Sequence, residues 1–268
     1  HISAVATGNA IDRLWTLRSM PSISLTIITI TRDDASGLAR TLSSAAGLRA
    51  AGAQHIVIDG GGDAVTTQNA VAQFEGGIRV YSRTPRGVAD AFNAGLAEAL
   101  GEWVWFLNGG DAVYEQLSPD WLFGLLATTG ASVITGAIYY DGESKPRSMP
   151  PIWSQWPPLV CWLAHPATLV RRPFLADAGG FDPRWKICMD YDLWFRLLSK
   201  SIAVDVISVP FARFDTNGMS QRSEMRSLLH GENLAVLWRY KKVIFTSVYR
   251  IAKGTLGVAI QNSKSLHR

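Results

Sequence analysis

The chain has 268 residues, of which 47% are hydrophobic and 18% are charged, and this balance excludes an intrinsically disordered protein. Its two cysteines, Cys161 and Cys188, form neither a metal-ligand pattern nor a disulfide framework, so we expect two buried thiols in a reducing compartment. The net charge of +4 is modest; no basic recognition module points to nucleic acid as a partner, and no run of apolar residues is long enough to predict a membrane span.

Between residues 22 and 114, apolar runs typical of buried strands alternate with patterns typical of helices. The expected strands cover residues 24–30, 55–58, 78–81 and 103–107, and the expected helices cover residues 38–46, 66–74 and 86–100. This alternation predicts an α/β domain with a mostly parallel, doubly wound central sheet and helices on both faces. Residues 1–21 lack the pattern of a secretion signal, and we expect an extension there.

Polar residues follow three of the expected strands. Thr31 follows the first strand, Asp59 the second, and Asn108 and Asp111 the fourth. Ligands of open α/β sheets bind beyond the carboxyl ends of the strands, so these residues mark a candidate binding edge. The carboxylate of Asp111 is a suitable ligand for Mg²⁺ or Mn²⁺, or it closes a β-turn. Asp59 begins an Asp-Gly pair and is equally consistent with an ordinary turn.

The region from residue 115 to residue 222 does not continue this strand–helix alternation. Residues 146–158 are rich in proline and predict a loop that crosses the site. His165 lies between an apolar run and a proline, where a histidine is more often a hydrogen-bonded core residue than a ligand. Residues 178–182, with two adjacent glycines, predict a turn.

Residues 189–198 predict a helix whose first turn carries two acids, Asp190 and Asp192. Either carboxylate is suited to cap the helix and to complement its dipole. Next to a phosphate and a metal ion, either one is also suited to act as a general base. The periodicity alone does not distinguish between them.

The C-terminal segment, residues 223–268, interleaves basic residues with aromatic ones. It predicts an amphipathic helical tail, which either lies on an anionic membrane surface or packs against its own domain. The first alternative implies a cytoplasmic protein on the inner face of the membrane.

Several enzyme classes lack their signatures in this chain. The glycines at residues 60–62 do not have the G-x-G-x-x-G spacing, and there is no P-loop, G-x-S-x-G turn or metalloprotease helix. A nucleotidyltransferase requires a glycine-rich, basic loop for its triphosphate, whereas residues 31–34 read Thr-Arg-Asp-Asp.

Eight short stretches occur in the order of one enzyme family. They are ITITRD at 28–33, VIDGGGD at 57–63, RGVADAFNAG at 86–95, FLNGGD at 106–111, HPAT at 165–168, GGFD at 179–182, MDYDLWFRL at 189–197 and GMS at 218–220. Over residues 22–220 the chain therefore resembles family 2 glycosyltransferases of the GT-A fold, and within them bacterial enzymes of exopolysaccharide and O-antigen assembly. The stretch at 86–95 is the most specific, because Gly, Asp, Asn and Gly recur in register.

The resemblance implies a donor site for a nucleoside-diphosphate sugar. Thr31 lies in the segment that is similar to the family's first nucleotide-contacting segment, and Asp59 corresponds to the acid that contacts the base. Asp90 corresponds to a contact with the sugar or the ribose, and Arg86 to a group that neutralises phosphate.

The resemblance also implies a reduced metal site. FLNGGD looks like a variant of the family's D-x-D motif, in which Asn108 replaces the first acid and Gly110 the middle one. Asp111 is then the one carboxylate of the motif left to bind Mg²⁺ or Mn²⁺.

On the acceptor side, the family's catalytic base is the acid before the aromatic residue of the MDYD stretch. This position is Asp190, so Asp192 is expected to be structural. His165, Ser220 and Arg222 correspond to acceptor-side or diphosphate-contacting positions.

The implied enzyme is a transferase domain over residues 22–222, with a nucleotide-sugar-binding half at 22–114 and an acceptor-binding half at 115–222. It would transfer a sugar with inversion to a saccharide or to a polyprenyl-diphosphate-linked acceptor in cell-surface polysaccharide synthesis. A non-catalytic member that binds a nucleotide sugar or saccharide is the alternative, because the metal motif is reduced. A nucleotidyltransferase is a weaker alternative.

Overall fold

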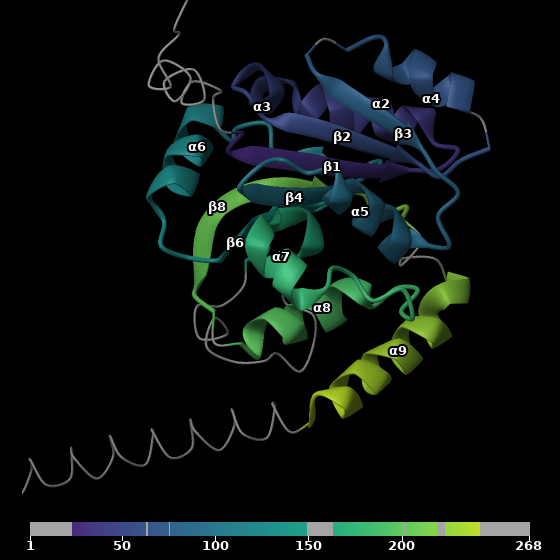
Figure 1. Cartoon of the computed structure of the whole chain (residues 1–268), viewed down its shortest axis with the longest axis vertical. Helices are drawn as coiled ribbons and strands as arrows, with labels where there is room; N and C mark the ends of the chain where they lie inside the picture. Colours follow the sequence, from purple (N-terminus) through teal and green to yellow (C-terminus); the bar gives the residue numbers. More distant parts are fainter. Residues whose placement is uncertain are drawn as a thin grey trace, which may run out of the picture.

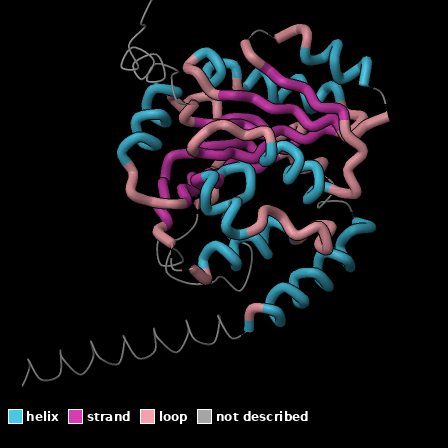
Figure 2. The backbone as a smooth tube through the Cα atoms, viewed as in Figure 1, coloured by secondary structure: helices cyan, strands magenta, loops and turns pink. Residues whose placement is uncertain are grey.

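A computed structural model describes residues 23–62, 64–74, 76–148, 163–200, 202–218 and 223–241. Its centre is one eight-stranded sheet with the strand order β3-β2-β1-β4-β7-β6-β8-β5, and helices cover both faces (Figure 1 and Figure 2). Four of the neighbouring strand pairs are parallel and three are antiparallel. The predicted α/β fold with a mostly parallel sheet is therefore confirmed.

The first half of the chain builds the parallel part of the sheet. Its strands are β1 (Leu25–Thr31), β2 (Gln54–Asp59), β3 (Ile78–Ser82) and β4 (Trp103–Asn108), with β1 between β2 and β4. The helices between them are α2 (Ala35–Ser44), α3 (Ala46–Ala50), α4 (Ala64–Val71) and α5 (Val88–Ala97). All four predicted strands and all three helical patterns are present. The helix expected at 86–100 is shorter, because it begins only after Gly87, whose φ of 154° is not helical.

The second half adds the antiparallel part and the remaining helices. It comprises β5 (Ala112–Val113), α6 (Pro119–Thr128), β6 (Val133–Tyr140), the 3₁₀ turn η2 (His165–Ala167), β7 (Thr168–Arg171), α7 (Arg172–Ala178), α8 (Met189–Leu198), β8 (Val204–Phe214), η4 (Ser223–Met225) and α9 (Arg226–Arg239). The helix predicted at 189–198 has the bounds of α8. The loop expected at 146–158 lies outside the described residues except for 146–148, as does the tail beyond residue 241.

The two faces of the sheet bury different sets of side chains, because neighbouring residues of a strand point to opposite faces. On one face, Ile27 of β1 packs in a cluster with residues of α3 and α6. On the other face, Ile28 packs in a cluster with Phe92 of α5 and Leu193 of α8. The helices that carry the predicted donor-site motif and the predicted base, α5 and α8, thus share one face of the sheet (Figure 1).

The cysteine prediction holds for Cys188, which is buried and unpaired, and burial raises the pKa of its thiol to about 12. Cys161 lies outside the described residues. None of the described helices has the length and the apolar content that a bilayer crossing requires.

Gly95 allows α5 to approach the sheet closely. A Cβ atom at residue 95 would lie 2.4 Å from Cγ2 of Ile28 and 3.3 Å from Cγ1 of Ile58. Gly124 in α6 is also helical, but it has no heavy atom within 4 Å of the same position. The two glycines therefore differ in packing and not in secondary structure.

We expect Gly95→Ala to lower the free energy of unfolding by about 1–3 kcal/mol, because the added methyl group forces α5 away from β1. Gly124→Ala is the matched control and should raise it by about 0.5–1 kcal/mol through helix propensity alone. Urea denaturation followed by circular dichroism measures both variants. Equal stabilities for the two variants would show that α5 does not depend on this close contact.

Candidate functional site

Three of the predicted site residues meet at the carboxyl edge of the parallel strands. Thr31 is the register partner of Asp59, and Ile30 is the partner of Asn108. The backbone N–H of Gly60 donates to the carbonyl of Thr31, and that of Gly109 donates to the carbonyl of Ile30, both at 2.9 Å. The ends of β1, β2 and β4 are therefore fixed to one another beyond the last ladder bonds.

Asp59 uses its two carboxylate oxygens differently. The side chain is 1% exposed, and Oδ1 accepts a hydrogen bond of 2.9 Å from the N–H of Gly61. Oδ2 is buried and has no hydrogen-bond partner among the described residues. Buried polar atoms are normally hydrogen-bonded, and leaving one without a partner costs about 1–3 kcal/mol. Oδ1 therefore makes the hydrogen bond expected of a turn, whereas Oδ2 is suited to accept a hydrogen bond from a ligand.

The turn after Asp59 requires its glycines. A Cβ atom at Gly61 would lie 2.7 Å from Oδ1 of Asp33, and one at Gly60 would lie 3.0 Å from Cγ of Pro85. The contact with Pro85 brings the segment before α5 against the end of β2. Arg86, which follows this proline, is thereby near the strand edge.

Asp90 closes the first turn of α5. Its Oδ2 accepts a hydrogen bond of 3.1 Å from the backbone N–H of Arg86, and the Arg86 guanidinium lies 4.0 Å from the same oxygen. Gly87, at the N-cap, offers no side-chain acceptor, so Asp90 takes over part of the capping. The Arg86 side chain is 88% exposed, so its charge faces solvent.

Asp111 is buried within the turn that follows β4. Its Oδ1 accepts from the backbone N–H of Asp215 at 3.0 Å, and its Oδ2 accepts from the backbone and side-chain amides of Asn108, both at 3.1 Å. The pKa of the Asp111 carboxyl is raised to about 7, chiefly by burial and to a smaller extent by the negative charge of Asp215, against the opposing effect of the hydrogen bonds from Asp215 and Asn108. Asn108 can donate to this carboxylate, which an aspartate at the same position could not do.

Asp215 is a carboxylate that the sequence interpretation missed. Gly110 has a φ of 103°, and a Cβ atom there would lie 2.4 Å from Oδ2 of Asp215. The Asp215 carboxylate therefore occupies the space in which a side chain at position 110 would lie. Asp215 directly follows β8, which is parallel to β6 and, through β7, to β4. The strand-end rule that selected Asp59 would have selected Asp215 too, had β8 been predicted.

The described residues contain no group of three or more His, Cys, Asp or Glu side chains arranged to hold a metal ion. Asp111 and Asp215 are a pair of adjacent carboxylates. Arg40 of α2 lies near both and forms a bidentate pair with Asp141, at 2.5 and 2.8 Å.

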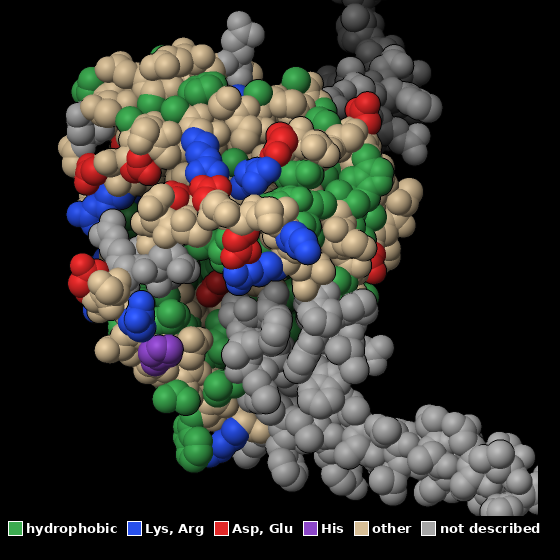
Figure 3. All heavy atoms as spheres, turned by 180° about the vertical axis from the view of Figure 1, so that it is seen from behind, with side chains coloured by type: hydrophobic (Ala, Val, Ile, Leu, Met, Phe, Trp, Pro, Cys, Tyr) green, Lys and Arg blue, Asp and Glu red, His purple; other side chains and the backbone are tan. Residues whose placement is uncertain are grey.

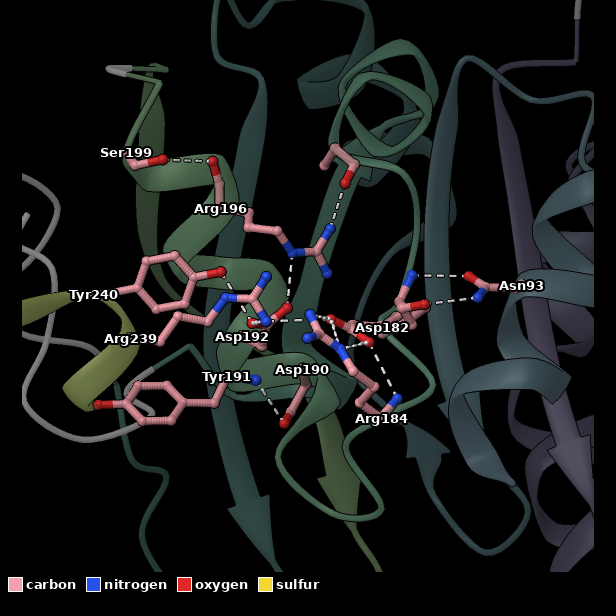
Figure 4. A network of polar contacts seen from close by, with 12 residues as sticks. Asn93, Asp182, Arg184, Asp190, Tyr191, Asp192, Arg196, Ser199, Arg239 and Tyr240 are labelled. Atoms are coloured by element: carbon pink, nitrogen blue, oxygen red, sulfur yellow. Dashed lines mark hydrogen bonds and ion pairs between the residues drawn. The ribbon is translucent and has the colours of Figure 1, made fainter. Parts of the chain in front are cut away.

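The two acids of α8 have separate surroundings, and their carboxylates point in different directions (Figure 4). Asp192 is fully buried and accepts from Nε of Arg196 at 2.7 Å and from the hydroxyl of Tyr240 at 2.9 Å. Oδ1 of Asp190 accepts from the backbone N–H of Tyr191 at 2.7 Å. Burial raises the pKa of the Asp190 carboxyl to about 6, against the opposing effect of backbone hydrogen bonds.

These surroundings differ between the two acids in ways that bear on their chemistry. Asp192 is committed to a buried ion pair with Arg196, as a structural residue is. A carboxyl group with a pKa raised toward neutrality, such as that of Asp190, is suited to accept a proton at physiological pH.

His165 lies in an aromatic cluster that joins β4, α5 and α8. Its ring stacks on Phe106 at 5.7 Å between centroids, and it contacts Phe92 and Trp194 at 5.1 and 6.2 Å. Neither ring nitrogen has a hydrogen-bond partner among the described residues, and burial lowers the pKa of the imidazole to about 4. The expected core location agrees with the structure, but the expected hydrogen bonding of the ring is not found in the described part of the chain.

One side-chain amide ties α5 to the turn at 178–182. Nδ2 of Asn93 donates to the carbonyl of Phe181, and the N–H of Phe181 donates to Oδ1 of Asn93, both at 2.8 Å (Figure 4). Gly180 has a φ of 66°, and a Cβ atom there would lie 2.4 Å from Oδ1 of Asn93. The Asn and Gly of two distant motifs thus form one contact. Ser220 and Arg222 lie outside the described residues.

The sheet, with acids and amides gathered at the carboxyl edge of its parallel strands, defines the class of α/β proteins that bind ligands at that edge. Within this class, residues 26–201 match the family described as Glycosyl transferase family 2. The chain belongs to this family, and it is a glycosyltransferase.

Curated relatives and solved structures agree with this assignment. An uncharacterized glycosyltransferase of Mycobacterium tuberculosis is 30% identical over 226 residues, which cover 78% of this chain and 80% of the relative. A glycosyltransferase of PGL/p-HBAD biosynthesis from Mycobacterium bovis is 28% identical over 130 residues, covering 47% of this chain and 49% of the relative.

The fold is similar to that of Staphylococcus aureus TarS, in a crystal structure of residues 1–349 in complex with UDP. The TM-score is 0.57 at 14% identity, and the likeness covers 72% of this chain and 60% of the TarS fragment. For the same fragment in complex with UDP-GlcNAc the TM-score is 0.53, and the likeness covers 58% of the fragment.

Proposed function

We propose that the enzyme transfers a sugar from a nucleoside diphosphate to an acceptor hydroxyl with inversion at the anomeric carbon. The observation that carries this proposal is the buried Oδ2 of Asp59, at the carboxyl edge of the parallel strands and without a protein partner among the described residues. A nucleobase N–H is a donor that would satisfy it. UDP is bound in one TarS structure of similar fold, which supports a nucleotide donor.

The other donor contacts follow from the same edge. Thr31 ends β1, next to the strand of Asp59, and Asn108 ends β4 on the far side of β1. Arg86 follows the proline that packs on the Asp59 turn. The exposed guanidinium of Arg86 is suited to the diphosphate. Asp90 faces the same segment and would contact the ribose or the sugar.

Asp190 is the proposed base. It removes the proton of the acceptor hydroxyl while the acceptor oxygen forms a bond to the anomeric carbon. The bond from that carbon to the diphosphate oxygen breaks at the same time, and the leaving nucleoside diphosphate keeps the electron pair. At a pKa of about 6 the Asp190 carboxyl is still mostly ionised at pH 7, and it is more basic than an ordinary carboxylate.

A divalent cation fits the pair Asp111 and Asp215. Each oxygen of Asp111 already accepts protein hydrogen bonds, whereas Oδ2 of Asp215 lies over Gly110 at the strand edge. Mg²⁺ is commonly held by one or two carboxylates, with phosphate oxygens and water completing its shell. When bound, the cation supplies positive charge for the leaving diphosphate. Asp215 would provide the carboxylate that Asn108 and Gly110 do not.

The acceptor is proposed to be a saccharide or a polyprenyl-diphosphate-linked sugar in cell-surface polysaccharide synthesis. His165, Ser220 and Arg222 are the proposed acceptor-side or diphosphate contacts. Such a lipid-linked acceptor requires the enzyme to reach a membrane surface.

The end of α9 offers a surface suited to this contact. Leu234 and Trp238 lie one helical turn apart and are 68% and 70% exposed. The ammonium of Lys241 lies 3.4 Å from the centroid of the Trp238 ring. Hydrophobic and basic side chains gather at the lower tip of the described residues in Figure 3. Exposed Trp and Leu beside Lys are typical of helices that lie at an anionic lipid interface.

A non-catalytic member that binds a nucleotide sugar or saccharide is the second candidate. The observation that favours it is Asp111, whose carboxylate is occupied by Asn108 and Asp215 within the protein. The two candidates differ in turnover and not in donor binding.

We expect a thermal-shift panel of UDP-, GDP- and dTDP-sugars, each with Mn²⁺, Mg²⁺ or chelator, to give a metal-dependent shift with one nucleotide class. A ligand at 100 times its Kd adds about 2.7 kcal/mol to the stability of the folded state. Asp59→Asn should weaken this shift, because the amide has one acceptor oxygen and does not accept from both the Gly61 N–H and the base N–H. Asp120→Asn, on an exposed position of α6, is the control. No shift for the wild-type protein with any donor would contradict the proposed donor site.

Asp190→Asn and Asp192→Asn make the same change two residues apart and should have opposite effects. We expect Asp190→Asn to lower turnover at least 100-fold, with donor binding retained and no loss of stability at pH 8, because it removes a carboxylate that is costly to bury. Asp192→Asn leaves Arg196 without its charge partner and should lower the free energy of unfolding by about 3 kcal/mol. Release of nucleoside diphosphate and urea denaturation measure the two effects.

The pH dependence of the wild-type enzyme adds a check. Only the ionised base accepts a proton, and the pKa of Asp190 is raised to about 6, so turnover should be constant above this pH and fall tenfold per unit below it. Full turnover for Asp190→Asn would exclude Asp190 as the base, whereas no turnover for the wild-type enzyme with any donor would leave a binding protein.

We expect the full chain to sediment with vesicles that contain phosphatidylglycerol and not with pure phosphatidylcholine vesicles. Salt at 0.5 M should release it, because the Debye length is then only about 4 Å. Trp238→Ser should weaken the binding, whereas Trp121→Ser, which removes an exposed tryptophan of α6, should not. Binding that is independent of lipid charge and of Trp238 would exclude this surface as the membrane contact.

A further inference from the structure

The segment that leads into Asp190 is held by a residue far along the chain. Glu232 of α9 is only 8% exposed. Its Oε1 accepts from the backbone N–H of Lys186, and its Oε2 accepts from those of Ile187 and Cys188, all three at 2.9 Å. One carboxylate thus binds three consecutive backbone donors immediately before α8.

These donors belong to a helix start that lacks a local cap. Cys188 is the N-cap residue of α8, and its side chain makes no capping hydrogen bond. The first N–H groups of a helix have no partners within the helix, and a carboxylate near them is also favoured by the helix dipole. Of these groups Glu232 binds the N–H of Cys188, the N-cap residue, and its other two donors, Lys186 and Ile187, precede the helix. Its carboxylate thus fixes from α9 the segment that ends two residues before Asp190.

A second set of contacts, from Arg239 of α9 and its C-cap residue Tyr240, holds Asp192, two residues after the proposed base. The hydroxyl of Tyr240 donates to Asp192 at 2.9 Å (Figure 4). The Tyr240 ring stacks on Phe195 with centroids 5.0 Å apart. The guanidinium of Arg239 lies 3.3 Å from Asp182 and 3.7 Å from Asp192. Asp190 therefore lies between two segments that α9 fixes.

The docking of α9 is also apolar. Val236 is fully buried in a cluster with Ile187, Cys188, Tyr191 and Phe195. Lys186–Cys188 lie within the family match, which ends at residue 201, whereas α9 lies wholly beyond it. The contacts of α9 therefore reach the matched domain from a segment outside the match.

We propose that α9 positions the Asp190 carboxylate for catalysis, with Glu232 as the positioning residue before it and Tyr240 as the one after it. This inference rests on the proposed function, in which Asp190 is the base. Glu232 acts through the backbone of residues 186–188 and does not touch the reacting atoms. Displacing a catalytic group by about 1 Å can cost 100-fold in rate, so the effect of losing this support should appear in turnover.

The test uses the full chain with Glu232→Gln, which has one acceptor oxygen and an NH₂ group in place of the second oxygen. At least one of the three backbone donors then loses its acceptor. Using the sugar nucleotide that gives the largest thermal shift, we expect kcat for nucleoside diphosphate release to fall between about 10- and 100-fold. The KM for the donor and the donor-induced thermal shift should stay unchanged. Hydrogen exchange of the amides of residues 186–188 should become faster.

Two controls separate positioning from loss of stability. Glu224→Gln removes an exposed carboxylate next to α9 and should behave as the wild-type enzyme. Leu126→Ala destabilises the buried side of α6 and should lower the melting temperature without lowering kcat at 25 °C.

If Glu232→Gln does not fold, Tyr240→Phe replaces it, since this change keeps the ring stack and removes only the hydrogen bond to Asp192. We expect it to lower kcat severalfold at constant donor KM.

The outcomes distinguish the inference from the function on which it rests. A wild-type kcat for Glu232→Gln and Tyr240→Phe, while Asp190→Asn is inactive, would overturn the inference and leave the function intact. The same result follows if either variant loses no more kcat than Leu126→Ala at an equal loss of melting temperature. An Asp190→Asn variant with full turnover would overturn both. A fall in kcat at constant KM supports the inference.

Discussion

The site depends on the parallel alignment of β1, β2 and β4. Because these strands are covered on both faces, their side chains are committed to the core, and chemistry is left to the residues just beyond their carboxyl ends. The hydrogen bonds from Gly60 to Thr31 and from Gly109 to Ile30 extend this alignment past the ladder into the turns. Asp59 and Asn108 are thereby fixed on either side of the central strand. Side chains at this edge can therefore be substituted while the alignment of the strand ends is retained.

The turn after β4 illustrates such a change. An aspartate side chain at position 108 would repel the Asp111 carboxylate, whereas the side-chain amide of Asn108 donates a hydrogen bond to it. A side chain at position 110 would overlap Asp215, whereas Gly110 leaves room and adopts the positive φ that the turn requires. The two departures from the D-x-D pattern thus have separate effects: Gly110 leaves room for Asp215, and the side chain of Asn108 donates to Asp111. Carboxylates remain at this place, but they come from two segments more than 100 residues apart in the chain.

What the sequence could predict follows from the range of the interactions. The strands and helices of the first half arise from periodicities within ten residues or so, and the pattern of α8 is equally local, so these elements were predicted well. The assignment of Asp190 over Asp192 required a family resemblance, because the difference lies in Arg196, Tyr240 and the burial around them. Asp215 and Glu232 were missed because each acquires its role from a contact with a distant turn. The hydrogen-bonding state of His165 depends on packing that no local pattern encodes.

Asp190 and Asp192 show why a helix start of this kind needs support from elsewhere. Burial makes the ionised Asp190 carboxylate costly, and this cost raises its pKa to about 6 and makes it a better base. The same cost favours any movement of the chain that returns the group to water, so the backbone around it must be held in place. The contacts from α9 do this: Glu232 binds the backbone N–H groups just before the helix, and the apolar cluster around Val236 packs against the helix start.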